Sequence, residues 1–170
     1  MATPKKCLSV LSGVTALVLA ITAITLTIRP VHAAGNSIVV IVNASNPVDN
    51  LTVGELRQIF LSDHSKWGSG RAVATVMVTP GAPERIAFLK IVCGMNNADF
   101  NKYFLQASFT GKYSTPPKEV STAQGVQKVV ANSPGAIGFV KAADFNGAAE
   151  VKVVKINGLS ASDEGYKLKM

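Results

Sequence analysis

Residues 51–70 read LTVGELRQIFLSDHSKWGSG, and this stretch predicts how the chain folds. Thr52 and Glu55 form a capping box, because the hydroxyl accepts from a first-turn amide and the carboxylate reaches back to the cap amide. Apolar residues then recur at helical spacing, so a helix is expected to start at Thr52. A polar turn leads through Trp67 and two glycines into a strand-like run, residues 72–78. We interpret Trp67 as a packing anchor rather than a ligand-stacking residue.

The first 33 residues are typical of a secretory signal. Lys5 and Lys6 precede an uncharged, mostly apolar run at residues 8–28, and the sequence VHA at residues 31–33 has small residues at the expected cleavage positions. The alternative is an uncleaved membrane anchor, because the run has about the length that spans a bilayer, ~20 residues. Threonines and serines within the run, and Pro30 after it, favour cleavage and export.

Loss of this segment changes the charge balance. The formal net charge falls from +7 to +4, because the segment carries Lys5, Lys6 and Arg29 and no acid. The remaining basic residues are scattered, which fits anionic ligands or envelope surfaces and does not support nucleic-acid binding. Cys93 is then the only cysteine, so we expect no intrachain disulfide and a buried structural thiol. Residues 34–170 suit a single domain.

The rest of the chain alternates strand-like and helix-like segments. Residues 37–42 (SIVVIV) are typical of a strand that is buried on both faces in a parallel sheet. Pro83 suits the first position of a helix that Gly94 ends. The inner face of that helix is predicted to be Ile86, Leu89 and Cys93.

Two further helices are expected. The first is capped by Asn96 or Asn97 and runs to about Ala107, and the second begins at a capping box formed by Ser121 and Gln124 and runs to about Ala131. A buried strand over residues 136–140 and an outer strand over residues 151–156 are expected to follow. No firm pattern follows in residues 157–170, so we expect a loosely held tail. Strands that alternate with helices predict an α/β layer architecture.

The sequence does not favour an enzyme. His64 is the only histidine after residue 33, and it lies in a polar turn between Asp63 and Ser65. Consecutive side chains point in different directions, whereas a catalytic triad needs partners from separate segments. We therefore interpret His64 as a solvated turn residue. His64 and Cys93 lack the spacing of a metal site, and neither a Walker-type loop nor GxGxxG is present, so we expect no cofactor.

A candidate binding site lies at residues 81–85, where a strand leads into a helix. Free first-turn amides and the positive end of a helix attract anions, and Arg85 could add a forked donor for phosphate or carboxylate. The alternative is that Glu84 complements the helix dipole and that Arg85 is solvated. The candidate ligand-binding residues are Gly81, Ala82, Glu84 and Arg85, with Ser45, Asn46 and Ser121, although turn and cap roles already explain the last three.

Two stretches together resemble a known family. Residues 51–70 are similar to a Leu-Ser/Thr…Leu…Ile-Phe-x-Gly…Trp…Gly stretch, and residues 134–140 (PGAIGFV) are similar to a Pro-Gly-Ala-Ile-Gly-Tyr-Val hallmark. Both belong to the periplasmic phosphate-binding proteins, the substrate-binding components of phosphate ABC transporters. The resemblance spans about residues 38–140. The resemblance implies a three-layer-like lobe of a periplasmic binding protein, with a mixed and mostly parallel sheet flanked by helices. The chain resembles the second of the family's two lobes, standing alone.

The phosphate loop of the family reads approximately Arg-x-x-Gly-Ser-Gly-Thr, and residues 78–84 correspond to it. Val78, Ala82 and Glu84 replace the arginine, the serine and the threonine, and only Gly81 is kept. Each lost buried hydrogen bond would cost ~1–3 kcal/mol, and Glu84 would repel an anion. We therefore expect no tight phosphate binding in the manner of the family.

Two functions follow from the resemblance. In the first, the chain is a periplasmic solute-binding accessory of a transport or sensing system, which takes a small phosphate-like anion and contacts an ABC transporter permease or an envelope sensor. In the second, it is an interaction module that kept the fold and lost the ligand, and it pairs with a first-lobe-like protein, a sensor or a second copy of itself, because a missing lobe leaves apolar surface to cover. Neither function includes nucleic acid, or a membrane span once the signal is cleaved.

Overall fold

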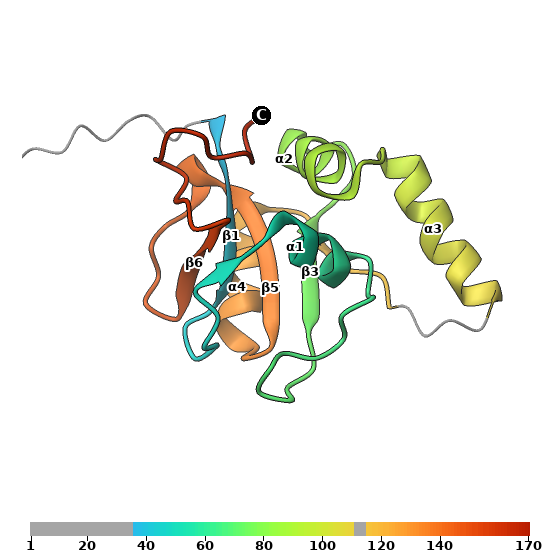
Figure 1. Ribbon diagram of the computed structural model, residues 1–170, viewed down its shortest axis with the longest axis horizontal. Coiled ribbons are helices and arrows are strands. Elements are labelled where there is room, and N and C mark those ends of the chain that lie inside the picture. The colour runs from blue at the N-terminus through green and yellow to red at the C-terminus, as the bar shows by residue number, and fades with distance from the viewer. Residues whose placement is uncertain (1–35, 111–114) are drawn as a thin grey trace, which may run out of the picture. The chain divides into compact units, whose positions relative to one another are not determined.

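The computed structural model describes residues 36–110 and 115–170 (Figure 1). The signal segment expected at residues 1–33 lies outside the described residues. All the described residues fall within one compact unit, Val31–Met170. None of the helices in this described part is both long enough and apolar enough to cross a membrane.

The described strands form one six-stranded sheet in the order β2-β6-β1-β5-β3-β4. Three neighbouring pairs are parallel (β2 with β6, β5 with β3, β3 with β4), and the two pairs that involve β1 are antiparallel. The expected mixed, mostly parallel sheet is therefore confirmed. Its strands are β1 (Ile38–Asn43), β2 (Asn50–Leu51), β3 (Ala74–Val78), β4 (Lys118–Val120), β5 (Ala136–Lys141) and β6 (Val151–Ile156).

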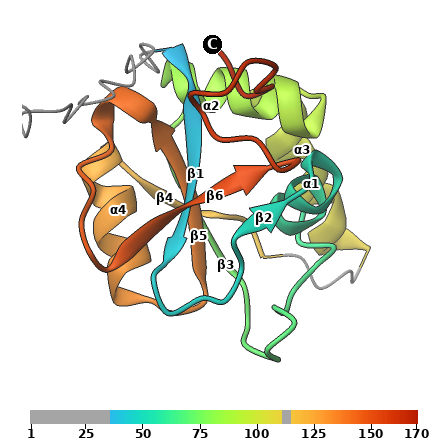
Figure 2. The ribbon, with the colours of Figure 1, turned by 60° about the vertical axis from the view of Figure 1, so that its left-hand side comes forward.

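Helices cover both faces of this sheet, which confirms the α/β layer architecture. The helical segments are α1 (Val53–Phe60), α2 (Pro83–Phe88), the π-helical turn η2 (Leu89–Cys93), α3 (Asn97–Phe109), α4 (Ala123–Asn132) and the short η3 (Ala142–Asp144). Figure 2 shows α4 on one side of the strands and α1, α2 and α3 on the other. Each face has its own apolar core, one filled by α1, η2 and α3 and the other by α4.

Strand β1 is buried on both faces, as its run of β-branched residues predicts, but it is antiparallel to both of its neighbours. Ile38, Val40 and Val42 enter one core, and Val39 and Ile41 enter the other. The expectation of a parallel strand was wrong. A continuous apolar run indicates that a strand is buried on both faces, but it does not indicate the direction of that strand relative to its neighbours.

The opening segment folds as its sequence predicts. The Thr52 hydroxyl accepts from the Glu55 amide at 3.1 Å, and the Glu55 carboxylate accepts from the Thr52 amide at 2.7 Å. The backbone hydrogen bond from Thr52 lowers the pKa of Glu55. Trp67 is only 4% exposed, and its indole N–H donates to the carbonyl of Gly135 at 2.9 Å. Trp67 therefore anchors the turn before β3 to the turn before β5.

The helix after β3 differs from its predicted form. Leu89 and Cys93 are buried, but Ile86 is 55% exposed. Placing Ile86 on the inner face was wrong, because α2 ends at Phe88 and the wider π-helical turn shifts which residues face the sheet. Gly94 ends the segment in the left-handed conformation, as expected. Burial raises the pKa of the Cys93 thiol to about 11, which confirms a buried structural cysteine.

Two later helices begin close to their predicted caps. Asn96 caps α3 by accepting from the Asp99 amide at 2.9 Å. Helix α4 is capped by Thr122, which accepts from the Gly125 amide at 3.0 Å. The capping box predicted at Ser121 and Gln124 was wrong, because the cap lies one residue later and Gly125 has no side chain that could complete a box. Two neighbouring hydroxyl residues can both serve as a cap, and the end of β4 at Val120 decides which of them does.

The tail is held more firmly than its sequence suggests. Tyr166 and Leu168 are buried in the core on the α1 side of the sheet. The Tyr166 hydroxyl donates to the carbonyl of Ile38 at 2.8 Å, and burial raises its pKa. The expectation of a loose tail was wrong, because two buried side chains, together with backbone hydrogen bonds from Ile38 to Leu168 and from Met170 to Asn36, dock the tail on the start of β1.

Candidate functional site

The candidate anion site lies in the turn that joins β3 to α2. Gly81 has a φ of +96°, a conformation that other residues rarely adopt, and this lets the chain reverse direction before Pro83 opens the helix. Ala82 is the N-cap residue and makes no side-chain capping bond. The first-turn amides of α2 therefore receive no side-chain acceptor from the N-cap residue.

Arg85 points into the protein. Its side chain is 1% exposed, and Nη1 donates to the Val78 carbonyl at 2.8 Å and to Glu119 Oε1 at 2.7 Å. Nε and Nη2 are buried and have no hydrogen-bond partner among the described residues. The interpretation of Arg85 as a solvated residue was wrong. A buried guanidinium with part of its donor set unused is the least satisfied charged group at this turn.

Glu84 is also buried, and it faces a different cation. Its Oε2 lies 3.6 Å from Lys141 Nζ and has no hydrogen bond within the described part of the chain. Glu84 lies in the first turn of α2, where a carboxylate complements the helix dipole as the sequence suggested. The start of α2 therefore holds two ion pairs, and their charges balance.

The structure brings only one of the three additional candidates to this turn. Ser121 directly follows β4, which runs parallel to β3, and the Thr79 amide donates to the Val120 carbonyl at 2.9 Å beside it. Ser45 and Asn46 follow β1, which runs the other way, so they lie at the opposite end of the sheet. Their inclusion in one site with Gly81 was wrong.

Ser45 and Asn46 serve the turn after β1 instead. The Ser45 hydroxyl donates to Asn43 Oδ1 at 2.7 Å, and Asn46 Oδ1 accepts from the Val48 amide at 3.1 Å. Asn43 in turn donates to two carbonyls at the end of α4. These hydrogen bonds account for Asn43, for Ser45 and for the Oδ1 of Asn46, whereas the buried Nδ2 of Asn46 has no hydrogen-bond partner among the described residues.

Glu119, which the sequence did not indicate, connects Arg85 to a groove. The groove is about 320 Å³ in volume and lies between α3 and the segment that leads into β4. No pattern in the sequence relates residues 85 and 119, because their contact depends on the register that sets Met77 opposite Glu119. The lining residues are mostly apolar: Phe100, Asn101, Phe104, Leu105, Ser108, Pro116, Pro117 and Glu119.

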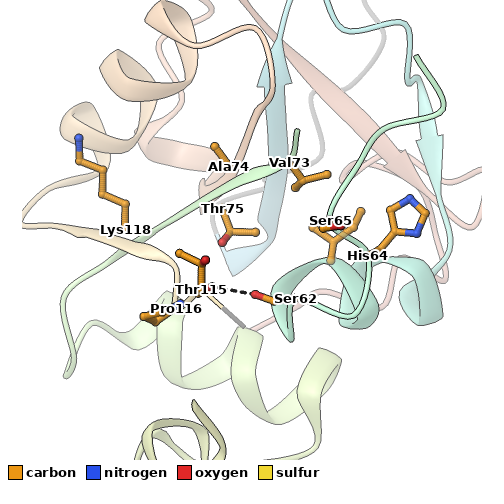
Figure 3. A pocket seen from close by; sticks show the side chains of 10 residues that line it. Ser62, His64, Ser65, Val73, Ala74, Thr75, Thr115, Pro116 and Lys118 are labelled. Atoms are coloured by element: carbon orange, nitrogen blue, oxygen red, sulfur yellow. Dashed lines mark hydrogen bonds between the residues drawn. The ribbon is translucent and has the colours of Figure 1, made fainter. Parts of the chain in front are cut away.

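A second pocket, of about 290 Å³, lies between the end of α1 and the start of β3. Figure 3 shows the hydroxyls of Ser62 and Thr75 near its centre, with Ser62 bonded to the Thr115 carbonyl at 2.7 Å, while His64 and Lys118 lie on opposite sides. His64 is exposed, as predicted for a turn residue. The pocket can hydrogen-bond a polar solute, but it brings no acid–base pair together.

No group of three or more histidine, cysteine, aspartate or glutamate side chains that could hold a metal ion occurs in residues 36–110 and 115–170.

Comparison with known proteins identifies the fold. No family model matches the chain. A putative phosphate ABC transporter substrate-binding protein from Clostridium perfringens, solved with bound phosphate, matches with a TM-score of 0.59 and 20% identity over 74% of this chain and 46% of that chain. An ABC-type phosphate transport receptor from Vibrio cholerae matches with a TM-score of 0.58 and 17% identity, over 74% of this chain and 48% of that chain.

A possible phosphate binding protein from Planctomyces limnophilus has a TM-score of 0.55 and 21% identity over 79% of this chain and 45% of that chain. The chain therefore matches about half the length of these proteins. At such low identity the likeness concerns the fold, and the chain has the fold of a lobe of a phosphate-binding protein. By their names these neighbours are binding proteins rather than enzymes.

Proposed function

We propose that this chain is an exported, periplasmic solute-binding domain that binds a small anion at the turn between β3 and α2. The observation that carries the proposal is the buried guanidinium of Arg85, whose Nε and Nη2 have no partner in the described part of the chain. The phosphate bound in the Clostridium perfringens neighbour gives independent support for an anion as ligand class.

The unused donors of Arg85 have an energetic cost. A buried polar group without a partner costs ~1–3 kcal/mol, and native proteins leave few such groups unless a water or a ligand satisfies them. A carboxylate or a phosphate suits a guanidinium well, because either anion can accept two parallel N–H···O bonds at once. Ser121 lies at the same end of the sheet and could supply a hydroxyl.

The affinity should be modest. Glu84 and Glu119 already balance the charges of Lys141 and Arg85, so an arriving anion gains little from the net field. The serine and threonine donors of the family's phosphate loop are absent from residues 78–84. We expect dissociation constants nearer ~1 mM than ~1 µM.

Isothermal titration and thermal shift with phosphate, sulfate and small carboxylates up to ~10 mM test the proposal. The wild-type chain should give heat and a rise in Tm with at least one of these anions. Arg85→Gln should abolish both, and Arg57→Gln, at an exposed position on α1, should change neither. Circular dichroism reports whether Arg85→Gln folds, and Arg85→Lys, which keeps the charge without the fork, serves if it does not. Absence of heat and shift with every anion would refute the proposal.

A second function, a ligand-free interaction module, is favoured by exposed apolar side chains on the α2 and α3 side. Ile86, Leu105 and Phe109 are 55%, 59% and 82% exposed. A permease, an envelope sensor or a second copy of the chain would cover them. Light scattering after size exclusion, together with an envelope pull-down, tests this function. A strictly monomeric chain that captures no partner would count against it.

A further inference from the structure

We propose that the groove between α3 and β4 binds an organic carboxylate with an apolar body, and that Glu119 holds the place of the ligand's carboxylate on Arg85 when the groove is empty. This inference rests on the proposed function, because it names the ligand class of the same guanidinium. In a site for an inorganic anion the affinity would come from the charge, whereas in this groove it comes from the apolar body of the ligand.

The first step is the mismatch between Arg85 and Glu119. A guanidinium has five N–H donors and pairs best with a carboxylate through two parallel hydrogen bonds. Here Glu119 contributes Oε1 alone, which accepts from Nη1 at 2.7 Å. Nε and Nη2 stay without a partner among the described residues. Glu119 therefore occupies the carboxylate position without using the whole donor set of Arg85.

The second step is the asymmetry in exposure of the pair. The Arg85 side chain is 1% exposed and the Glu119 side chain is 44% exposed. Arg85 is thus a fixed cation inside the protein, and Glu119 is a long side chain on a three-residue edge strand with solvent on its other side. Glu119 can turn into water when another anion takes its place on Arg85, because its own carboxylate is then hydrated and the buried guanidinium keeps an anionic partner.

The third step is what surrounds Glu119. The groove is walled by Phe100, Phe104, Leu105 and two prolines, and Glu119 is the one charged residue that lines it in the described part of the chain. Its volume of about 320 Å³ lies within the range of small-ligand sites. Leu105 is largely exposed and would become buried beneath a ligand. Apolar walls that end at an ion pair fit a molecule with an apolar body and one charged end.

The charge of that end follows from Arg85. When a ligand carboxylate replaces the Glu119 carboxylate, the buried guanidinium keeps one anionic partner and the released glutamate is hydrated. The exchange is almost balanced in charge, so the apolar body supplies the net affinity. Phosphate and acetate lack such a body and should bind more weakly than an aryl or branched-chain acid.

The test titrates the wild-type chain with acetate, 3-methylbutanoate and phenylacetate, and with 2-phenylethanol and 2-phenylethylamine as matched neutral and cationic probes. Phenylacetate should bind at least about tenfold more tightly than acetate, because only its ring buries apolar area in the groove. The alcohol and the amine should bind more weakly than phenylacetate, because neither can take the place of the Glu119 carboxylate on Arg85. Inorganic phosphate is titrated in parallel.

Two variants test the role of Glu119. Glu119→Gln should tighten phenylacetate binding by about five- to tenfold, because the amide no longer competes as an anion for Arg85. Glu164→Gln, a matched change at an exposed position in the tail, should leave the affinity unchanged. If changes at the ion pair impair folding, Leu105→Asn at the exposed groove wall should weaken phenylacetate binding by at least about threefold without loss of structure.

Several results would overturn the inference: equal affinities for acetate and phenylacetate, binding of the amine but not of the acid, or weaker phenylacetate binding in Glu119→Gln. If phosphate or sulfate binds while phenylacetate gains nothing over acetate, the inference fails and the proposed function stands. If no anion binds at all, both fail.

Discussion

Gly135→Ala should destabilise the protein strongly, although it adds a single methyl group. Gly135 precedes β5, and a Cβ built on it would lie 2.2 Å from the backbone carbonyl oxygen of Ala72. No side-chain rotation can relieve this contact, so one of the two backbone segments has to move. The Gly135 carbonyl accepts from the Trp67 indole at 2.9 Å and from the Ala74 amide at 3.0 Å, and such a movement would weaken both hydrogen bonds.

The expected loss is about 3–4 kcal/mol. Overpacking of a buried site costs ~1–3 kcal/mol, and each weakened hydrogen bond adds ~0.5–1.5 kcal/mol. For a domain of this size the loss corresponds to a fall in Tm of roughly 10 °C. Gly54→Ala is the matched control, because its Cβ would meet no atom closer than 3.9 Å on the exposed face of α1, and it should stabilise by ~0.5–1 kcal/mol.

Urea denaturation followed by the fluorescence of Trp67, the only tryptophan of the chain, measures both variants. The emission of Trp67 should also shift to the red in folded Gly135→Ala, because the turn that buries the indole opens. A stability within about 1 kcal/mol of the wild type would refute the reasoning, since it would mean that the Ala72 and Gly135 segments separate without cost.

Four further predictions concern single residues. Cys93 should react with an aromatic disulfide reagent at pH 8 only as fast as the protein unfolds, because the thiol is buried and its pKa is raised to about 11. Thr52→Ala should cost ~1 kcal/mol in a urea titration through loss of the α1 cap. The Thr52 backbone hydrogen bond lowers the pKa of Glu55 in the folded state, so its stabilisation is present above the unfolded pKa and is lost as the pH falls through the folded pKa. Glu55→Gln should therefore reduce the acid dependence of stability in a urea titration repeated across the acid range. His64→Ala should leave anion titrations unchanged and stability within ~0.5 kcal/mol, and a larger effect on either would contradict its assignment as a solvated turn residue.

The fold could be predicted well because the informative residues act locally or through burial. The residues that carry the resemblance have structural roles: Trp67 and Gly135 join two turns, and Phe139 stacks on Phe88 with ring centroids 3.9 Å apart. Such residues remain recognisable when ligand chemistry changes. They identify a scaffold and do not identify what it binds.

The candidate site could be predicted only in part. The turn at Gly81 agrees with the sequence, whereas the proximity of Ser121 depends on β4, a parallel neighbour of β3 that the sequence did not predict. Ser45 and Asn46, named with them as candidate ligand-binding residues, lie at the opposite end of the sheet, because β1 runs antiparallel to β5 and its composition does not indicate its direction. Arg85 was expected to face solvent or a ligand, and its pairing with Glu119 could not be foreseen.

By itself, the sequence determined the features whose partners lie within a few residues or whose composition records burial: the capping box of α1, the buried Cys93, the helix end at Gly94 and the two-sided burial of β1. Only the tertiary structure decided the direction of β1, the docking of the tail and the contact between residues 85 and 119. The physical reason is range. A hydrogen bond between residues three apart can be predicted from the types of those two residues. An ion pair between residues 34 apart in the sequence depends on the register of β3 against β4.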